Sequence, residues 1–268
     1  MKKTLPILAT ITFLTTMIGC KKEESASAPI SSGNTCAPGK WMNLVSGNSM
    51  VIASTFNQTE ETTAITNAIS EWNARSPSGI KMFNTTTTTA PVSSYSSLTQ
   101  YRDSVFGIYK QNPWFNDVSD NALAITQYFG YMRSNNGKNY LELTHADIIF
   151  NFENFNFTFS GVGFGHDFQT VLLHEMGHFL GFCHESANDS IMYPYYTSTN
   201  RQLKTFDIQQ LQARYSNPSA QPMMAKNAFS LKDLNIDEGT LVRGVIEMRD
   251  DGECHHYLDG KLQYKHKY

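Results

Sequence analysis

The stretch HEMGHFLGFCH, residues 174 to 184, combines histidine and glutamate at spacings that suit a metal site. His174 and His178 are four positions apart, so on a helix their imidazoles share one face, about 6 Å apart along the axis. Both rings can therefore reach a single ion. Glu175 is rotated away from that face and can lie beside the ion without binding it, within reach of a water on the metal. This pattern predicts a metal-activated water with a glutamate as general base.

The third histidine of the stretch, His184, can complete the site only if the helix ends before it. Gly181 is the residue type that most readily takes the positive φ of a helix C-terminus, so the chain can turn there and deliver His184. Three histidines leave the fourth tetrahedral position to water, as in catalytic rather than structural zinc sites. We therefore expect one catalytic Zn²⁺. The alternative of a purely structural site would need a fourth protein ligand.

Three helices are expected around these residues, and periodicity and capping signals place them. The first runs from about Thr59 to Ala74, the second starts near Asp167 and carries the histidines, and the third spans about Thr205 to Tyr215. Asn57 and Glu60 form a plausible capping box for the first helix, and the Asp167 carboxylate a credible N-cap for the second.

Short strands are expected on both sides of the histidine-bearing helix. ADIIFNF, from Ala146, alternates as a half-buried strand does, and NFTFSGVGFG is a short strand that ends in glycines. Near the C-terminus, Asp-Gly turns at Gly252 and Gly260 separate short alternating runs. This tail predicts a small β-meander.

The pattern H-E-x-x-H-x-x-G-x-x-H of residues 174 to 184 resembles that of the metzincin zinc endopeptidases. SIMYPYY adds Met192 where metzincins have a methionine turn that packs beneath the zinc site. ADIIFNF, DFQTVLLHEMGHFLGF and DIQQLQARY are also similar to parts of matrixin-like domains. The resemblance spans roughly residues 40 to 216 and implies an α+β fold: a twisted mixed sheet, an active-site helix and a C-terminal helix.

Two metzincin subgroups share features with this sequence. IMYP resembles matrixins, whereas Glu185, directly after the third histidine, resembles astacins. Astacins have a metal-binding tyrosine where this chain has Pro194, with Tyr193 and Tyr195 as its neighbours. Both subgroups stay open at this point.

The resemblance implies a zinc-dependent endopeptidase in which water on the zinc attacks the peptide carbonyl and Glu175 is the general base. Protein or peptide substrates would bind extended, along an exposed sheet edge. By analogy with the family, NFTFSG is the candidate edge. The alternative function is a surface-anchored zinc-binding lipoprotein that uses the fold without turnover.

The remaining histidines and cysteines give weaker signals. His145 and His166 are interpreted as ordinary strand-end or loop residues. His255 and His256 receive the same interpretation, because adjacent strand residues face opposite ways. Cys36 is a candidate latency ligand for the zinc, but NTCAPGK does not match the matrixin switch motif, and a disulfide from it to Cys183 or Cys254 is at least as plausible.

The N-terminus is typical of an exported bacterial lipoprotein. Two lysines precede an apolar run that ends in MIGC, which resembles a lipobox with Cys20 as the acylated residue. This predicts a signal peptide over residues 1–19, a flexible tether or pro-segment over 20–40, a catalytic domain over 41–216 and a β extension over 217–268. The expected location is the outer membrane, on its periplasmic or cell-surface face.

Composition adds one exclusion. The chain of 268 residues has a formal net charge of −3 and 17% charged residues. This balance gives no support to a nucleic-acid partner, which would require a basic surface. We therefore expect a protein substrate and a lipid anchor as the partners, and no nucleic acid.

Overall fold

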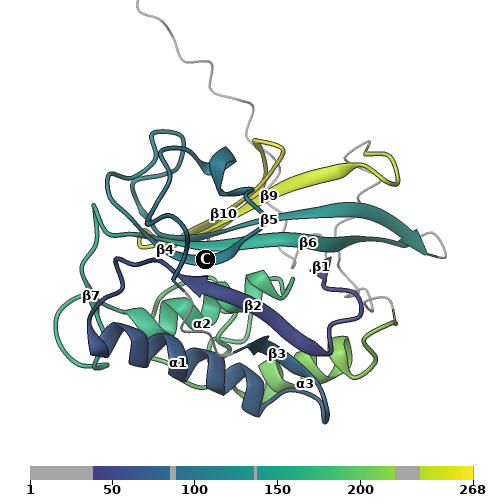
Figure 1. Ribbon diagram of the computed structural model, residues 1–268, viewed down its shortest axis with the longest axis horizontal. Coiled ribbons are helices and arrows are strands. Elements are labelled where there is room, and N and C mark those ends of the chain that lie inside the picture. The colour runs from purple at the N-terminus through teal and green to yellow at the C-terminus, as the bar shows by residue number, and fades with distance from the viewer. Residues whose placement is uncertain (1–38, 85–88, 136–137, 221–235, 268) are drawn as a thin grey trace, which may run out of the picture.

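The computed structural model describes residues 39–84, 89–135, 138–220 and 236–267, and its framework is a mixed nine-stranded sheet with three helices along one face (Figure 1). The helices are α1 (Thr59–Ala74), α2 (Phe168–Phe179) and α3 (Thr205–Tyr215), and a 3-10 turn, η1, covers Leu98–Tyr101. The strands before α2 are β1 (Gly39–Lys40), β2 (Ser46–Ile52), β3 (Lys81–Asn84), β4 (Phe106–Gln111), β5 (Ala122–Asn135), β6 (Lys138–Asn151), β7 (Phe157–Thr158) and β8 (His166–Asp167). Those after α3 are β9 (Leu241–Arg249), β10 (Glu253–Leu258) and β11 (Lys261–Lys267).

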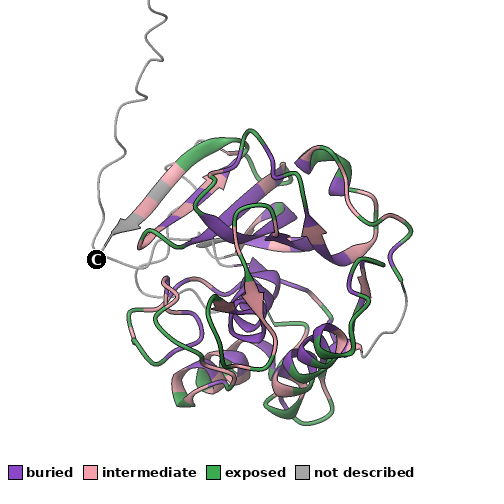
Figure 2. Ribbon diagram, turned by 90° about the vertical axis from the view of Figure 1, so that its left-hand side faces the viewer, coloured by how far each residue is buried: buried purple, intermediate pink, exposed green. Residues whose placement is uncertain are grey.

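The strand order of the large sheet is β11-β10-β9-β5-β6-β4-β2-β3, and β1 pairs with β6. From β3 to β6 the neighbouring strands run parallel, whereas from β6 to β11 they alternate in direction. This is the α+β arrangement expected from the sequence. Buried residues gather where the sheet faces the helices (Figure 2), so the core lies between these two layers.

Helix α1 has the bounds that its periodicity predicts, and its apolar positions Ile65, Ala68, Ile69 and Trp72 are buried. The predicted capping box is wrong by one residue. The N-cap is Gln58, whose N–H donates to Oε2 of Glu61 at 3.1 Å. Glu61 also forms an ion pair with Lys110 of β4, and this tertiary contact selects the register. Glu60 is left exposed.

Strand β6 contains the predicted strand from Ala146 but is longer and more deeply buried. Both of its edges are paired, with β4 and β5, and Asp147 and Ile149 on the second face are fully buried, so this face is covered as well. The prediction of a half-buried strand is therefore wrong, because alternation does not reveal what covers the polar face. Phe152 falls just beyond the strand.

Helix α2 is buried along its whole length, with the sheet on one side and α1 on the other. Its N-cap is Asp167, as predicted, and the carboxylate accepts a hydrogen bond from the Thr170 N–H at 2.9 Å. Arg201 forms an ion pair with the same carboxylate. A helix held in this way is a rigid platform for side chains that must keep a fixed geometry.

The C-terminal strands form the predicted meander, with Gly252 and Gly260 at positive φ in its turns. They also continue the main sheet, because β9 pairs antiparallel with β5 over most of its length. The segment NFTFSG does not form an edge of this sheet. Its strand β7 pairs with β8 in a separate two-stranded sheet, so the segment lies apart from the main sheet, and its role as the substrate edge stays a prediction.

Several predictions fall on residues 1–38, which lie outside the described part of the chain. These are the signal peptide, the lipidation at Cys20, the role of Cys36 and all of the tether except its last two residues, Gly39 and Lys40, which form β1. The domain boundaries likewise stay predictions. Within the described ranges, no helix combines the length and apolar character needed to cross a bilayer.

Candidate metal centre

The last turns of α2 and the loop after it bring the three predicted histidines together. His174 and His178 are one turn apart on the helix, as their spacing requires. The helix then ends, and Gly181 takes a φ of 81°. A Cβ at this position would lie 2.3 Å from the backbone oxygen of Gly39, so only glycine fits the turn that delivers His184.

The Nε2 atoms of the three histidines converge on one point. The separations are 3.0 Å from His174 to His178, 3.0 Å from His174 to His184 and 2.9 Å from His178 to His184. Two nitrogen donors on one tetrahedral zinc lie about 3.3 Å apart, close to these values. Within the described chain this is one of two clusters of metal-type donors.

The tautomers of two histidines follow from their second nitrogens. Nδ1 of His174 lies 2.7 Å from the carbonyl oxygen of Ile191, and Nδ1 of His178 lies 2.9 Å from that of Phe182. A carbonyl can only accept, so each Nδ1 carries the proton and each Nε2 presents a lone pair. Lone pairs that face one another at 3.0 Å repel without a cation between them, and this donor set therefore fits Zn²⁺.

The protonation of these histidines also suits metal binding. Burial lowers the pKa of His174 to about 4, against a smaller effect of its hydrogen bond to Ile191. Burial, followed by the proximity of His174, lowers the pKa of His178 well below its usual value. Both imidazoles are thus neutral near pH 7, the form that binds metal.

Glu175 lies beside the histidine cluster and is fully buried. The Thr126 hydroxyl on β5 donates to its Oε2 at 2.5 Å, and its Oε1 has no hydrogen-bond partner. Burial raises the pKa of Glu175 to about 8, and the bond from Thr126 acts in the opposite direction. A bound cation would also favour the ionised form. Oε1 of Glu175 is therefore a buried acceptor without a partner, next to three converging imidazoles. This arrangement suits a general base that accepts a proton from a water molecule.

Met192 packs against Gly177, which lies between His174 and His178 on α2. A Cβ on Gly177 would lie 2.1 Å from the sulfur of Met192, so helix and turn meet without a side chain between them. Asp207 of α3 fixes the turn: it accepts from the Ile191 N–H at 3.0 Å and from the Ser190 hydroxyl. This turn also supplies the carbonyl that orients His174.

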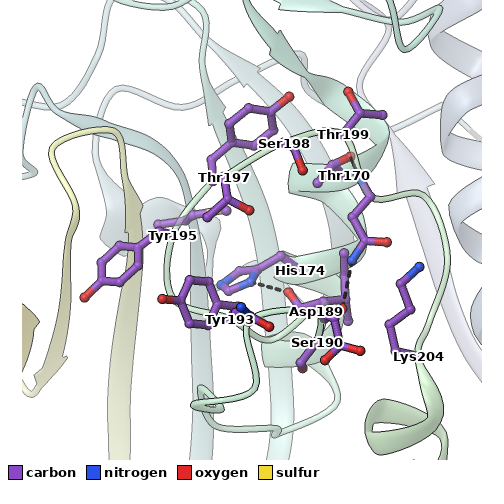
Figure 3. A pocket seen from close by; sticks show the side chains of 15 residues that line it. Thr170, His174, Asp189, Ser190, Tyr193, Tyr195, Thr197, Ser198, Thr199 and Lys204 are labelled. Atoms are coloured by element: carbon purple, nitrogen blue, oxygen red, sulfur yellow. Dashed lines mark hydrogen bonds between the residues drawn. The ribbon is translucent and has the colours of Figure 1, made fainter. Parts of the chain in front are cut away.

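A cavity of about 280 Å³ opens beside His174 (Figure 3). Residues 188–200, which follow the third histidine, form most of its wall, and Thr170 and Lys204 add to it. The lining is rich in hydroxyl groups and includes Tyr193 and Tyr195. Met248 of the C-terminal strand β9 also lines this cavity.

The C-terminal strands contribute two polar residues to the metal centre. Nε2 of His256 lies 3.0 Å from Nδ1 of His184, and Sγ of Cys254 lies 3.3 Å from the same nitrogen. These three residues form the second cluster of metal-type donors. All three predicted histidines and Glu175 are 1% exposed or less, so the site is closed in this conformation.

The remaining histidines and cysteines are placed as follows. Nε2 of His145 contacts Asp147 at 2.7 Å and Nε2 of His166 contacts Asp250 at 2.8 Å, and neither belongs to a metal-type cluster of the described chain. Cys183 is disulfide-bonded, whereas Cys254 is free and buried. The alternative in which Cys36 pairs with Cys254 is therefore wrong.

Sequence reasoning missed Thr126, Met248, Cys254 and His256. The interpretation of His256 as an ordinary tail residue is wrong. One signal was available: Cys254 and His256 are two positions apart in an alternating segment, which places both on the same face of a strand. Thr126 and Met248 carry no such local signal.

Comparison with known proteins agrees with this geometry. The family model described as Matrixin matches residues 48–216 of the chain. Karilysin of Tannerella forsythia is 38% identical over 82 residues, which are 31% of this chain and 16% of karilysin. Matrilysin of Felis catus is 44% identical over 62 residues, which are 22% of this chain and 24% of matrilysin. The matched stretches thus cover less than a quarter of either relative. Between the two subgroups considered, the family match favours matrixins over astacins.

Proposed function

Because this chain belongs to the matrixin family of zinc metalloendopeptidases, we propose that it hydrolyses peptide bonds in proteins or peptides outside the cytoplasm. In this proposal one Zn²⁺ is held by His174, His178 and His184, and Glu175 is the general base. The observation that carries it is the convergence of three Nε2 atoms, 2.9 to 3.0 Å apart, beside a buried carboxylate.

The zinc, when bound, supplies a Lewis acid that polarises the peptide carbonyl and acidifies water. The side chains of the protein transfer the proton and fix the geometry of the site. Glu175 accepts a proton through Oε1, the oxygen without a hydrogen-bond partner, and later returns it to the departing amine. Thr126 holds the other oxygen and so fixes the rotamer of the carboxylate. Met192 supports the helix from below.

The cavity beside His174 is the proposed recognition pocket for a substrate side chain next to the cleaved bond. Its volume of about 280 Å³ is large enough for one long or aromatic side chain. Hydroxyl groups and Lys204 line it, so it favours a side chain with a polar end over a purely aliphatic one. A peptide library with one randomised position tests this preference.

Location is the second part of the proposal. The lipobox-like MIGC and the charged, Ser/Ala-rich stretch after it support export and a lipid anchor at Cys20. In a bacterial host, the parent is expected in the membrane fraction and Cys20→Ser in the soluble fraction. Equal distribution of the two proteins would contradict the anchor.

The test of the activity compares the parent with Glu175→Gln, which keeps the ligands and removes the base. Because the C-terminal strands cover the site, both are also prepared with Cys254→Ser. Each should bind one zinc per chain, and E175Q should cleave casein about 10²- to 10⁴-fold more slowly. Glu60→Gln, on the exposed side of α1, is the control and should cleave like the parent.

Two results would overturn the activity. If no protein binds zinc, the histidine cluster is not a metal site. If all proteins bind zinc and none cleaves in either background, the zinc-binding lipoprotein without turnover becomes the better description.

A further inference from the structure

Strand β9 occupies the position that an extended substrate needs. β5 is the strand nearest the base, because its Thr126 holds Glu175. The outer edge of β5 pairs with β9, with Thr126 opposite Ile246 and Ala124 opposite Met248. A peptide that binds by adding a strand to β5 must displace β9.

The side chains of β9 lie on both sides of the histidine cluster. Ile246 and Met248 are two positions apart and therefore share a face of the sheet. Ile246 lines a small cavity with His178, and Met248 lines the large cavity beside His174. Both are buried, at 3% and 2% exposure. β9 thus fills these positions as a substrate strand would.

Strand β10 adds donor atoms beside the third histidine. Cys254 pairs with Met248 and His256 pairs with Ile246, so all four side chains point toward α2. Sγ of Cys254 lies 3.5 Å from Nε2 of His184, the nitrogen that faces the other two histidines. A sulfur and a nitrogen bound to one tetrahedral zinc are separated by about 3.5 Å. The same sulfur lies 3.3 Å from Nδ1 of His184, and it clusters with His184 and His256 rather than with His174 and His178, so ligation requires the Cys254 side chain to turn toward the three Nε2 atoms.

We propose that β9 and β10 form an intramolecular plug in which Cys254 is the fourth ligand of the zinc and Met248 occupies the substrate pocket. On binding, the thiol loses its proton to solvent and the thiolate takes the metal position that water needs for hydrolysis. β9 is therefore not cut although it lies in the site. The proposal rests on the proposed function, since it names how the same site is kept inactive.

His256 completes the arrangement as a positioning residue. Its Nε2 accepts the proton on Nδ1 of His184, in the role that carbonyl oxygens have for the other two ligands. The turn between β9 and β10 is fixed independently, because Asp250 contacts His166 and Asp251 contacts Arg249 and Asn121. These contacts hold the plug in register with the metal centre.

The first test detects metal binding by the Cys254 thiolate directly and needs no measurement of peptide cleavage. The full chain is loaded with Co²⁺ in place of zinc, beside Cys254→Ser and the control His255→Gln, which lies on the opposite face of β10. The parent and H255Q should show a thiolate-to-cobalt charge-transfer band, and C254S should lack it. Cys183 cannot supply this band because it is disulfide-bonded. A parent without the band, or a band that persists in C254S, would overturn the proposal.

Metal stoichiometry distinguishes the plug from a second site. One Co²⁺ per chain is expected, shared by the histidine cluster and Cys254. Two ions per chain would mean that His184, Cys254 and His256 bind an ion of their own, and the fourth-ligand assignment would be wrong.

Peptide hydrolysis provides the third readout. C254S should cleave about tenfold faster than the parent or more, because each 1.4 kcal/mol lost from the closed state raises the open fraction tenfold. Met248→Gln, which keeps Cys254 and similar bulk, should also cleave faster, so a folding defect in one variant does not decide the result. Equal rates in all three would overturn the plug and leave the proposed function intact. A band in the parent with no cleavage by any protein would support Cys254 ligation and contradict the proposed function.

Discussion

Two regions of the molecule orient the three histidines, and they differ in how permanent they are. Carbonyl oxygens of the α2 loop and the methionine turn, at Phe182 and Ile191, orient His178 and His174. His184 is oriented instead by His256, a residue of the C-terminal meander 72 positions away. Phe182 and Ile191 of the first region are buried, whereas the second region leaves the site if the three meander strands β9, β10 and β11 are released from β5.

The two regions therefore have different effects: the first holds the metal ion, and the second controls whether substrate can reach it. The framework residues hold the ion whether or not the meander is in place, because two ligands and their partners belong to one helix and the loops beside it. The meander adds the partner of the third ligand and closes the site. We therefore expect substitutions in the two regions to affect zinc binding by different amounts.

Loss of a framework ligand should have the largest effect. His178→Gln removes one of the three imidazole ligands. Loss of a residue that only hydrogen-bonds to a ligand lowers metal affinity by up to about 100-fold, so loss of the ligand itself should lower zinc affinity by more than that. Competition with a chromophoric chelator measures this. His255→Gln, which changes a histidine outside both clusters, is the control. Affinity within tenfold of the parent would contradict the ligand assignment.

The next largest effect is expected from the residue that fixes the methionine turn. One oxygen of Asp207 accepts from the N–H groups of Ile191 and Lys204, at 3.0 and 2.8 Å, and the other accepts from the Ser190 hydroxyl. Asp207→Asn replaces one of these two acceptors by an amide donor and removes the charge. The free energy of unfolding should fall by about 3 kcal/mol, measured by urea denaturation. Asp237→Asn changes an exposed residue and should leave the urea midpoint where it is. An unchanged midpoint for D207N would show that the turn does not depend on this carboxylate.

On the meander side, His256→Gln should weaken zinc binding by about 10- to 100-fold. The ligand His184 remains, but its Nδ1 loses the partner that sets its ring orientation. His255→Gln, one residue away on the opposite face of β10, should have no comparable effect. If both variants bind zinc alike, orientation by the meander is unimportant.

The smallest effect concerns pH and the turn of the meander. The hydrogen bond from Arg249 is the main reason that the pKa of Asp251 lies well below its usual value. Because the pKa of Asp251 is lower in the folded protein than in the unfolded chain, its ionised form stabilises the fold above about pH 4. This stabilisation is lost as the pH falls further. Because Asp251 is 31% exposed, the loss should stay below about 1 kcal/mol. Amide exchange at about pH 3 should rise in β10 but not in α2, and Asp251→Asn should remove the pH dependence.

The local parts of this structure could be predicted from the sequence. The bounds of α1 and α3, the N-cap Asp167 and the turn at Gly181 follow from signals within a few residues of each element. The three histidines were predicted for the same reason, since helical spacing and one glycine determine where they lie. The cap of α1 was misplaced by one residue, because the contact between Glu61 and Lys110 joins positions 49 residues apart.

The closure of the site could not be predicted because it depends on distant strand pairing. The Asp-Gly turns indicated a meander, but no signal in its sequence predicts that β9 pairs with β5, a strand more than a hundred residues earlier in the chain. Once that pairing exists, alternation alone puts Cys254 and His256 on the side of the metal centre. The spacing of Cys254 and His256 was the one clue in the sequence, whereas the free thiol of Cys254 is known only from the structure.

The order of the strands has a consequence for the solubility of the protein. With the meander in place, the outermost strand at this end of the sheet is β11, whose sequence carries lysines at positions 261, 265 and 267. Lysines on an edge strand discourage edge-to-edge association. Release of the meander would expose β5, a strand of 14 residues with unpaired backbone groups along its edge. The open form should therefore self-associate in a concentration-dependent way unless a peptide covers that edge, and its working lifetime should be limited by aggregation as much as by substrate.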